Sequence, residues 1–387
     1  MRHYETDPLL KTLPERPGPP LAVPIRIFEA KLPDGVPAYR WDETAKTMAA
    51  LLRYGYGVPH YRQEKLQQDL GIPIADSVLQ ELSEVVADCG HAPYRNLRTL
   101  AAQGDQMHLD DTICRILELM KENKEKKPER VGIFTTALIS KVGEHEIALF
   151  TSGRNHMGEN IESLLKERSA ELAPPRLMTD GTGVLPKKLN AILGNCLTHG
   201  RRQFADIKDN FPIEVEYVID RFAEIYHFDA LAQKKAMSDD ARLKFHIENS
   251  GPVIKTLKAW CTDQTVSKKC EPNSGLGKAI KYLDKRWEKL THFLRVPGAP
   301  LSNDIVERLI KRCVLHRKNS MFYKTQHGAV LGDILMTLIH TAVRASKNPF
   351  DYLTALQLHR TLATKNPQDW LPWTYESSKA AINKLSK

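Results

Sequence analysis

The sequence lacks the features that would place it in a membrane or outside the cell. Its 387 residues contain no run of about 18 apolar residues, so no transmembrane helix is predicted. The opening residues 1–7 are polar and acidic, unlike a secretory or transit signal. The six cysteines include no Cys-x-x-Cys pair, so neither a zinc ribbon nor a redox dithiol is indicated. These absences predict a cytoplasmic, reduced protein in which most thiols are buried.

The charge balance is moderately basic. Lysine and arginine outnumber aspartate and glutamate by 56 to 47, which gives a formal net charge of +9. A basic surface attracts polyanions and favours nucleic acid as a partner. An ordinary basic soluble protein of this length can carry the same excess, so charge alone does not decide the function. The length allows two or three domains with at least one substantial core.

The N-terminal third predicts an extended arm followed by a small helical domain. Eight prolines in residues 1–38 exclude long helices there and indicate an extended, proline-rich arm. Residues 39–104 predict a trihelical domain with helices at 44–54, 61–70 and 74–86. Glycine-containing turns between the helices are typical of a helix-turn-helix module. Contact with DNA and a purely structural bundle remain equally open for this domain.

The middle of the chain alternates strands and helices. Residues 105–200 predict the first part of an α/β core with a mixed five-stranded sheet, in the order β-β-β-α-β-α-β of ribonuclease H-like folds. The lysine-rich run at 121–127 is expected to be a hairpin loop. The expected strands are 105–119, 130–142, 146–151, 176–179 and 195–198, and the expected helices are 157–169 and 185–193.

The remainder of the chain is predicted to be helical. Residues 201–298 have apolar side chains at helical spacing and predict an all-helical insertion. Residues 299–347 predict the return of the ribonuclease H-like core, with a glutamate-bearing helix and the helix after it. Residues 348–387 predict a helical C-terminal segment.

Three acidic residues, Asp110, Asp180 and Glu307, occur in contexts that favour a divalent metal site. Asp110 lies on the first predicted strand and Asp180 ends the fourth, and these strands are neighbours in the predicted sheet. Glu307 borders the apolar stripe of a helix expected to pack against that sheet. Three converging carboxylates raise one another's pKa unless a cation is bound. Two Mg²⁺ or Mn²⁺ ions held by such acids can promote phosphodiester cleavage.

Each acid also has a plainer interpretation. Asp110 and its neighbour Asp111 point to opposite faces of a strand, so only one can be a ligand, and we favour Asp110. Asp180 could simply form a turn. Glu307 could form a surface ion pair with Arg308 or Lys311. The joint pattern of the three acids favours the metal site over these alternatives.

Several blocks of sequence resemble the transposases of the insertion sequence 66 group, which belong to the DDE class and have a ribonuclease H-like core. The block 108–112 is similar to the family's His-Ala-Asp-Glu-Thr, and 177–181 is similar to the block that ends in the second aspartate and glycine. Block 196–204 is similar to Cys-Trp-Ala-His-x-Arg-Arg-x-Phe, and 301–308 to the Asp-Asn-x-x-x-Glu-Arg helix. Weaker similarity extends to 59–64, 316–322, 348–353 and 370–373.

The resemblance implies a transposase that cleaves DNA and transfers strands in DNA recombination, with Asp110, Asp180 and Glu307 as catalytic ligands of two Mg²⁺ or Mn²⁺ ions. Asn303 is expected to orient the carboxylate of Glu307 without binding the metal itself. The implied partners are the double-stranded DNA of the element's ends and its target, further copies of the chain, and possible accessory proteins of the same element. The implied location is the bacterial cytoplasm, at the nucleoid, with no membrane contact. The candidate DNA-binding residues are His199, Arg201, Arg202, Arg308, Lys311, Arg317 and Lys318.

Two rival functions accompany this prediction: a descendant that binds DNA without cutting it, and a host ribonuclease H-like nuclease such as a junction resolvase. The sequence carries no cysteine set like the N-terminal zinc-binding region usual in the family. A truncated or domesticated descendant that binds DNA without cutting, as a regulator or inhibitor, therefore remains open. His199 is also as well explained by a structural role as by contact with DNA.

Overall fold

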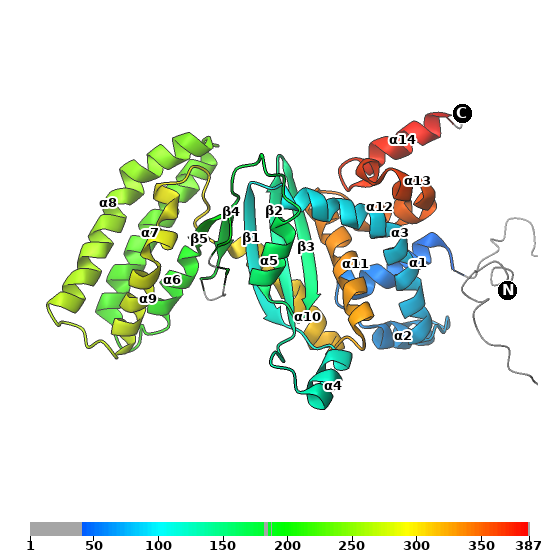
Figure 1. Cartoon of the computed structure of the whole chain (residues 1–387), viewed down its shortest axis with the longest axis horizontal. Coiled ribbons are helices and arrows are strands. Elements are labelled where there is room, and N and C mark those ends of the chain that lie inside the picture. The colour runs from blue at the N-terminus through cyan, green and yellow to red at the C-terminus, as the bar shows by residue number, and fades with distance from the viewer. Residues whose placement is uncertain (1–40, 182–184, 187, 386–387) are drawn as a thin grey trace, which may run out of the picture. The chain divides into compact units, whose positions relative to one another are not determined.

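A mixed five-stranded sheet organises the structure, a computed structural model that describes residues 41–181, 185–186 and 188–385 (Figure 1). The strand order is β3-β2-β1-β4-β5, with β1, β2 and β3 antiparallel and β1, β4 and β5 parallel. The predicted mixed five-stranded sheet is confirmed. The predicted arm at 1–38 lies outside the described residues. The strands are β1 (Gln106–Ile113), β2 (Phe134–Val142), β3 (His145–Gly153), β4 (Arg176–Thr179) and β5 (Ile192–Asn195).

The two parallel pairings bring distant segments together at the centre of the sheet. His108 of β1 lies opposite Met178 of β4, two residues before each of the predicted acids. Parallel neighbours require a long crossover, and here it contains β2, β3 and helix α5 (Met157–Leu165). The expected adjacency of the strands that lead to Asp110 and Asp180 is therefore confirmed.

Helices cover both faces of the sheet and one of its edges. Helix α5 contacts the face that carries Asp111, and helix α10 (Asp304–Ser320) contacts the opposite face, beside His108 (Figure 1). Helix α11 (Gln326–Arg344) lies along the free edge of β3. With both faces covered, β2 and β3 are largely buried and rich in aliphatic and β-branched residues.

Side chains of α11 complete the hydrogen bonding of the β3 edge. Asp333, Thr337 and Thr341 are spaced four residues apart on one face of the helix, and they accept from the main-chain N–H groups of Ser152, Phe150 and Ala148 at 2.7, 3.3 and 3.2 Å. Four helical residues advance about 6 Å and two strand residues about 6.6 Å, so the two periods match. The helix thereby protects an edge that could otherwise pair with another chain.

The N-terminal described segment is helical, as predicted, but its last helix is longer than expected. It comprises α1 (Glu43–Ala50), the π-helical turn η2 (Leu51–Gly55), α2 (His60–Asp69) and α3 (Asp76–Ala102). The prediction ended the third helix at residue 86, which is wrong. Its buried stripe continues to Leu97 and Ala101, and Gly90 allows close packing because a Cβ there would lie 2.3 Å from Leu338 of α11.

Four local predictions within the sheet region are also wrong. The expected hairpin loop at 121–127 is mostly helix α4 (Leu117–Lys126), supported by Lys–Glu pairs four residues apart. The expected first strand therefore ends at Ile113. The expected helix at 185–193 is absent from the described residues of that stretch, and the expected strand at 195–198 lies earlier, as β5. Parallel pairing with β4 recruits Ile192–Asn195 into the sheet, an effect that local propensity does not contain.

The second half of the described chain is almost wholly helical, as predicted. Helices α6 to α9 enclose a second buried hydrophobic cluster that includes Phe204, Phe222 and Ile280. Among the described residues, no helix is both long and apolar enough to cross a membrane. The helices are α6 (Leu197–Ala205), α7 (Pro212–Lys234), α8 (Asp239–Val266), α9 (Gly275–Leu290), η3 (His292–Leu294), α12 (Pro349–Leu358), α13 (Arg360–Lys365), η4 (Pro367–Trp370) and α14 (Tyr375–Leu385).

Candidate metal centre

Asp110 lies half-buried near the middle of β1, and its carboxylate interacts with two other acids. Its Oδ1 accepts a hydrogen bond of 2.8 Å from the main-chain N–H of Asp111. The pKa of Asp110 is raised to about 7, mainly by burial and to a smaller extent by the negative charges of Asp180 and Glu307, against the lowering effect of the Asp111 N–H. The ionisation of Asp110 therefore depends on acids that come from two other elements.

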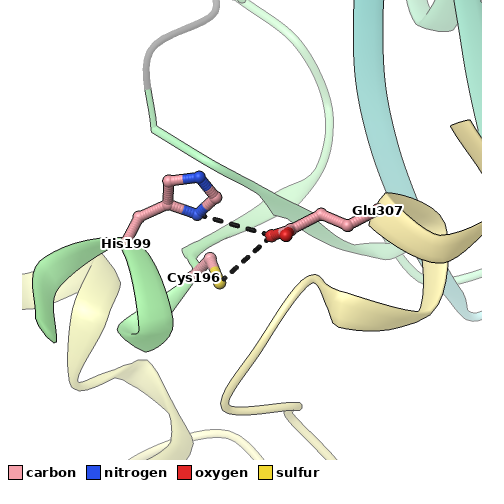
Figure 2. Close-up of side chains that lie close together, drawn as sticks. All are labelled: Cys196, His199 and Glu307. Carbon is pink, nitrogen blue, oxygen red and sulfur yellow. Dashed lines mark hydrogen bonds and ion pairs between the residues drawn. The ribbon is translucent and has the colours of Figure 1, made fainter. Parts of the chain in front are cut away.

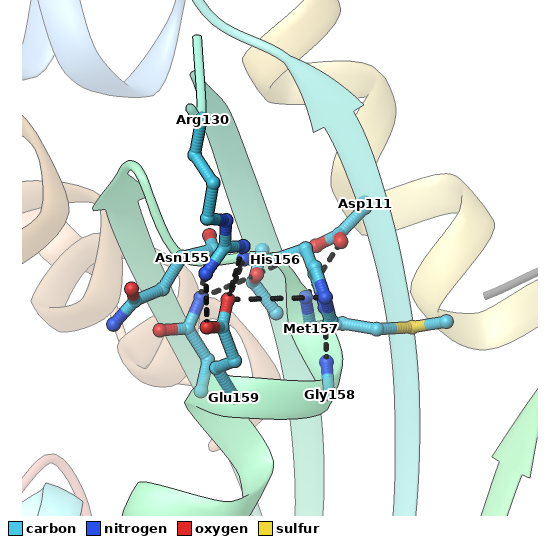
Figure 3. Close-up of polar contacts among 9 residues, drawn as sticks. Asp111, Arg130, Asn155, His156, Met157, Gly158 and Glu159 are labelled. Carbon is cyan, nitrogen blue, oxygen red and sulfur yellow. Dashed lines mark hydrogen bonds and ion pairs between the residues drawn. The ribbon is translucent and has the colours of Figure 1, made fainter. Parts of the chain in front are cut away.

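Asp111 lies on the other face of β1 and is engaged in structure. Its carboxylate accepts 2.6 Å hydrogen bonds from the main-chain N–H of Met157, at the start of α5, and from the Thr136 hydroxyl on β2 (Figure 3). Burial raises the pKa of Asp111, and these two donors oppose that effect. A carboxylate at a helix N-terminus satisfies an otherwise unpaired N–H and interacts well with the helix dipole.

A capping box fixes the same end of α5. The His156 side chain accepts from the Gly158 N–H at 3.1 Å, and Glu159 accepts from the His156 N–H at 3.2 Å (Figure 3). Arg130 donates to Glu159 in turn, at 2.8 Å through Nη2. The N-terminus that receives Asp111 is thus held rigidly against the sheet.

Asp180 follows β4 directly and lies half-buried at the start of a turn. Gly181 has a φ of +81°, a conformation that glycine adopts without strain. The main-chain carbonyls of Asp180 and Gly181 accept from Tyr282 Oη at 3.2 Å and from Arg286 at 3.1 and 3.2 Å, both on α9. The sequence did not assign this role to Tyr282 or Arg286, because nothing local links α9 to this turn.

Glu307 lies in the first turn of α10, which is anchored to β1 by Asn303. The Asn303 side chain is fully buried, donates to the Leu109 carbonyl at 2.8 Å and lies 3.1 Å from His108 Nδ1. The backbone that carries Glu307 therefore lies beside the strand that carries Asp110. Asn303 positions the start of α10 through its hydrogen bond to the main chain of β1.

The carboxylate of Glu307 lies closest to Cys196 and His199 (Figure 2). Glu307 Oε1 is 3.9 Å from Cys196 Sγ and 3.5 Å from His199 Nδ1. Within the described parts of the chain, this is the one group of three potential metal ligands whose atoms all lie within 4.8 Å of one another. Asp110 and Asp180 do not belong to a group as tight.

Cys196 is the residue of this group that the sequence prediction missed. It was counted among the buried thiols, and it is buried, which raises its pKa. It caps the N-terminus of α6, where the main-chain N–H of Asn303 donates to its sulfur at 3.2 Å. The spacing Cys196-x-x-His199 places both side chains on the first turn of α6, and this spacing was the available signal.

The predicted DNA-binding residues are distributed along α6 and α10. In the described structure, Glu307 forms its ion pair with His199 and not with Arg308 or Lys311, the alternative that the sequence left open. Arg317 donates to the Thr112 hydroxyl at 3.0 Å and to the Ile113 carbonyl. Arg202, Arg308, Lys311 and Lys318 are exposed, whereas His199, Arg201 and Arg317 are half-buried.

Comparison with known proteins decides the family. The family described as "Transposase IS66 family" matches residues 40–331, which include all three acids and the Cys196–His199 pair. The chain belongs to the IS66 family of transposases. A family of DDE transposases implies the use of a divalent metal, and the mixed sheet is consistent with it.

Three curated relatives come from Sinorhizobium fredii (strain NBRC 101917 / NGR234), and all are described as uncharacterized. Protein y4jD is 30% identical over 190 residues, which are 48% of this chain and 36% of the relative. Protein y4hP is 27% identical over 209 residues (49% and 36%), and y4qI is 26% identical over 195 residues (48% and 34%). The match thus spans about a third of the length of these three relatives.

Proposed function

We propose that this IS66 family member is a DDE transposase that cleaves DNA and transfers the cut strand in a metal-dependent reaction. Asp110, Asp180 and Glu307 are the proposed ligands of two Mg²⁺ or Mn²⁺ ions. The observation that carries the proposal is the parallel pairing of β1 with β4, in which His108 lies opposite Met178, two residues before Asp110 and Asp180, while Asn303 anchors the start of α10 to β1. The strand order β3-β2-β1-β4-β5 supports a ribonuclease H-like core around them.

The donor chemistry of the acids fits hard divalent cations. Carboxylate oxygens are the ligands that Mg²⁺ and Mn²⁺ prefer, and half-burial leaves room for water and phosphate oxygens. When bound, such ions would stabilise charge on the attacking and leaving oxygens of a phosphodiester. The pKa of Asp110 is raised to about 7, and a cation bound beside its carboxylate would displace the proton.

The other residues of the chain position these acids and the DNA. Asn303 holds the start of α10 on β1, and Tyr282 and Arg286 hold the turn after Asp180. The exposed basic side chains on α6 and α10 supply positive charge for the phosphate backbone. The proposed partners are double-stranded DNA, further copies of the chain and accessory proteins of the same element, in the cytoplasm of a bacterium.

A nicking assay on supercoiled DNA tests this proposal. The protein should nick DNA only when Mg²⁺ or Mn²⁺ is present, and Asp110→Asn and Asp180→Asn should each reduce nicking to background. Asp111→Asn is the matched control, because its carboxylate binds Met157 and Thr136 on the opposite face. Asp111→Asn should retain metal-dependent nicking at temperatures where it stays folded. An equal loss of nicking in Asp110→Asn and Asp111→Asn would contradict the assignment of Asp110 as a metal ligand.

The second candidate function is DNA binding without cleavage, as a regulator or inhibitor. It is favoured by one observation: in the described residues Glu307 forms a tight group with Cys196 and His199, and Asp110 and Asp180 are not members of that group. A protein that binds duplex DNA yet produces no metal-dependent nicks would establish this function in place of the first.

A further inference from the structure

We propose that Cys196, His199 and Glu307 form a binding site for a borderline-soft divalent cation of the Zn²⁺ class. The site joins the first turn of α6 to the first turn of α10, across more than 100 residues of sequence (Figure 2). It is distinct from the proposed Mg²⁺ site in its donor chemistry, although both use Glu307. The Zn²⁺ site itself does not depend on the proposed function.

Two of the three distances within the group are close to those of a tetrahedral zinc site. Zinc bonds of about 2.3 Å to sulfur and about 2.0 to 2.2 Å to nitrogen and oxygen place neighbouring ligand atoms roughly 3.4 to 3.6 Å apart. In the structure, Glu307 Oε1 is 3.5 Å from His199 Nδ1 and 3.9 Å from Cys196 Sγ. The ligand atoms of Cys196 and His199 lie within 4.8 Å of each other, so the group can close around one ion by side-chain movement.

The same distances are poor for a cluster held by hydrogen bonds alone. His199 Nδ1 is buried and has no hydrogen-bond partner, although Glu307 lies 3.5 Å away. The thiol of Cys196 reaches Glu307 only at 3.9 Å, which is a weak contact. Buried polar atoms normally have a partner, and His199 Nδ1 lacks one although two potential metal ligands lie beside it. A cation in the gap would supply it to all three side chains.

The sulfur of Cys196 already has one main-chain donor beside it. The main-chain N–H of Asn303 donates to Cys196 Sγ at 3.2 Å. A sulfur at the N-terminus of a helix gains further stabilisation of its negative charge. N–H donors that support a ligand sulfur in this way are common outer partners of metal sites.

Thiolate, imidazole and carboxylate together select Zn²⁺ over Mg²⁺, because Mg²⁺ takes oxygen ligands almost exclusively. Three protein ligands leave a fourth position open to water or to an oxygen of a bound phosphate. The side chains of His199 and Glu307 are 18% and 22% exposed, which gives solvent access to that position. An ion here would hold Glu307 away from Asp110 and Asp180.

Substitution with Co²⁺ tests the site by its colour, independently of any activity. The full chain should bind Co²⁺ with the visible bands of a tetrahedral ion and a sulfur-to-cobalt charge-transfer band, both removed by Zn²⁺ and unaffected by excess Mg²⁺. Cys196→Ser should abolish the charge-transfer band. The matched control is Cys114→Ser, which changes a half-buried cysteine outside the group and should leave the band intact.

A second variant keeps the test decisive if Cys196→Ser fails to fold. His199→Gln, on the half-buried surface of α6, should weaken Co²⁺ binding by at least about tenfold, since loss of outer partners alone costs roughly 10- to 100-fold. A wild-type protein without the band, or a band that survives in Cys196→Ser, would overturn the proposal. Asp180→Asn separates the two proposals, because it should lose nicking and keep the cobalt band.

Discussion

The side-chain amide of Asn303 donates a hydrogen bond of 2.8 Å to the main-chain carbonyl of Leu109, 194 residues earlier in the chain. This bond joins the first turn of α10 to β1, and the His108 ring on the same strand lies 3.1 Å from the other amide atom. One buried side chain thus sets the position of Glu307 relative to Asp110.

Replacement of Asn303 by alanine should therefore destabilise the protein. The change leaves the Leu109 carbonyl and the His108 ring without their buried partner, which costs about 1 to 3 kcal/mol in the free energy of unfolding. The measurement is the urea midpoint at constant pH. Asn319→Ala, which removes one half-buried bond to Gly57 at the other end of α10, is the control and should cost less. Equal midpoints for the wild type and Asn303→Ala would disprove the anchoring role.

Gly181→Ala should impair nicking more than stability. An alanine at φ +81° costs about 1 to 2 kcal/mol, and its Cβ would lie 3.0 Å from Asn195 Cγ and 3.1 Å from Arg286 Nε. Relief of this crowding moves the turn that carries Asp180. Gly143→Ala is the matched control, because it has a φ of +57° with nothing within 4 Å of the new Cβ. Both variants should lose similar stability, and only Gly181→Ala should lose nicking.

Asp333 should make the protein less stable as the pH rises from about 4 to 7. Burial raises the pKa of Asp333 to about 7 from its ordinary value of 3.8, and the hydrogen bonds from Ser152 oppose this effect only partly. Between these values the folded state keeps a proton that the unfolded state releases, so stability falls with rising pH. The loss reaches up to about 4 kcal/mol at neutral pH.

The neutral variant Asp333→Asn should remove this one contribution to the pH dependence, because an amide keeps an acceptor for Ser152 and does not ionise. Urea midpoints measured at several pH values between 4 and 8 provide the check. The exposed residue Asp351 offers a control, since Asp351→Asn should show the same change of urea midpoint with pH as the wild type. Identical slopes in the wild type and Asp333→Asn would refute the assignment to Asp333.

Zn²⁺ should inhibit nicking that is supported by Mg²⁺, if both proposals hold. An ion bound to Cys196, His199 and Glu307 occupies the carboxylate that the Mg²⁺ site requires. The inhibition should begin near one equivalent of Zn²⁺ per chain. In Cys196→Ser the Zn²⁺ concentration for half-inhibition should rise at least about tenfold, relative to that variant's own rate without Zn²⁺. Equal sensitivity of the two proteins would argue against a shared Glu307.

The sequence was sufficient for the existence of the first four strands, apart from some of their ends, and for the faces of Asp110 and Asp111. Alternation on β1 predicted that Asp110 and Asp111 point to opposite faces, and the bonds of Asp111 to α5 agree. It was not sufficient for the stretch 185–193, which was expected to be helical. There, pairing with β4 overrides local preference and draws Ile192–Asn195 into the sheet.

The sequence by itself determined the periodic features: the alternation of the strands, the apolar stripe of α10 and the order of the acids along the chain. Only the tertiary structure decided that Glu307 meets Cys196 and His199, and that α11 closes the edge of β3. The physical reason is the separation in sequence of the residues involved. Periodicity reports which side of an element is buried, whereas a contact between residues more than 100 positions apart depends on how all the intervening elements pack.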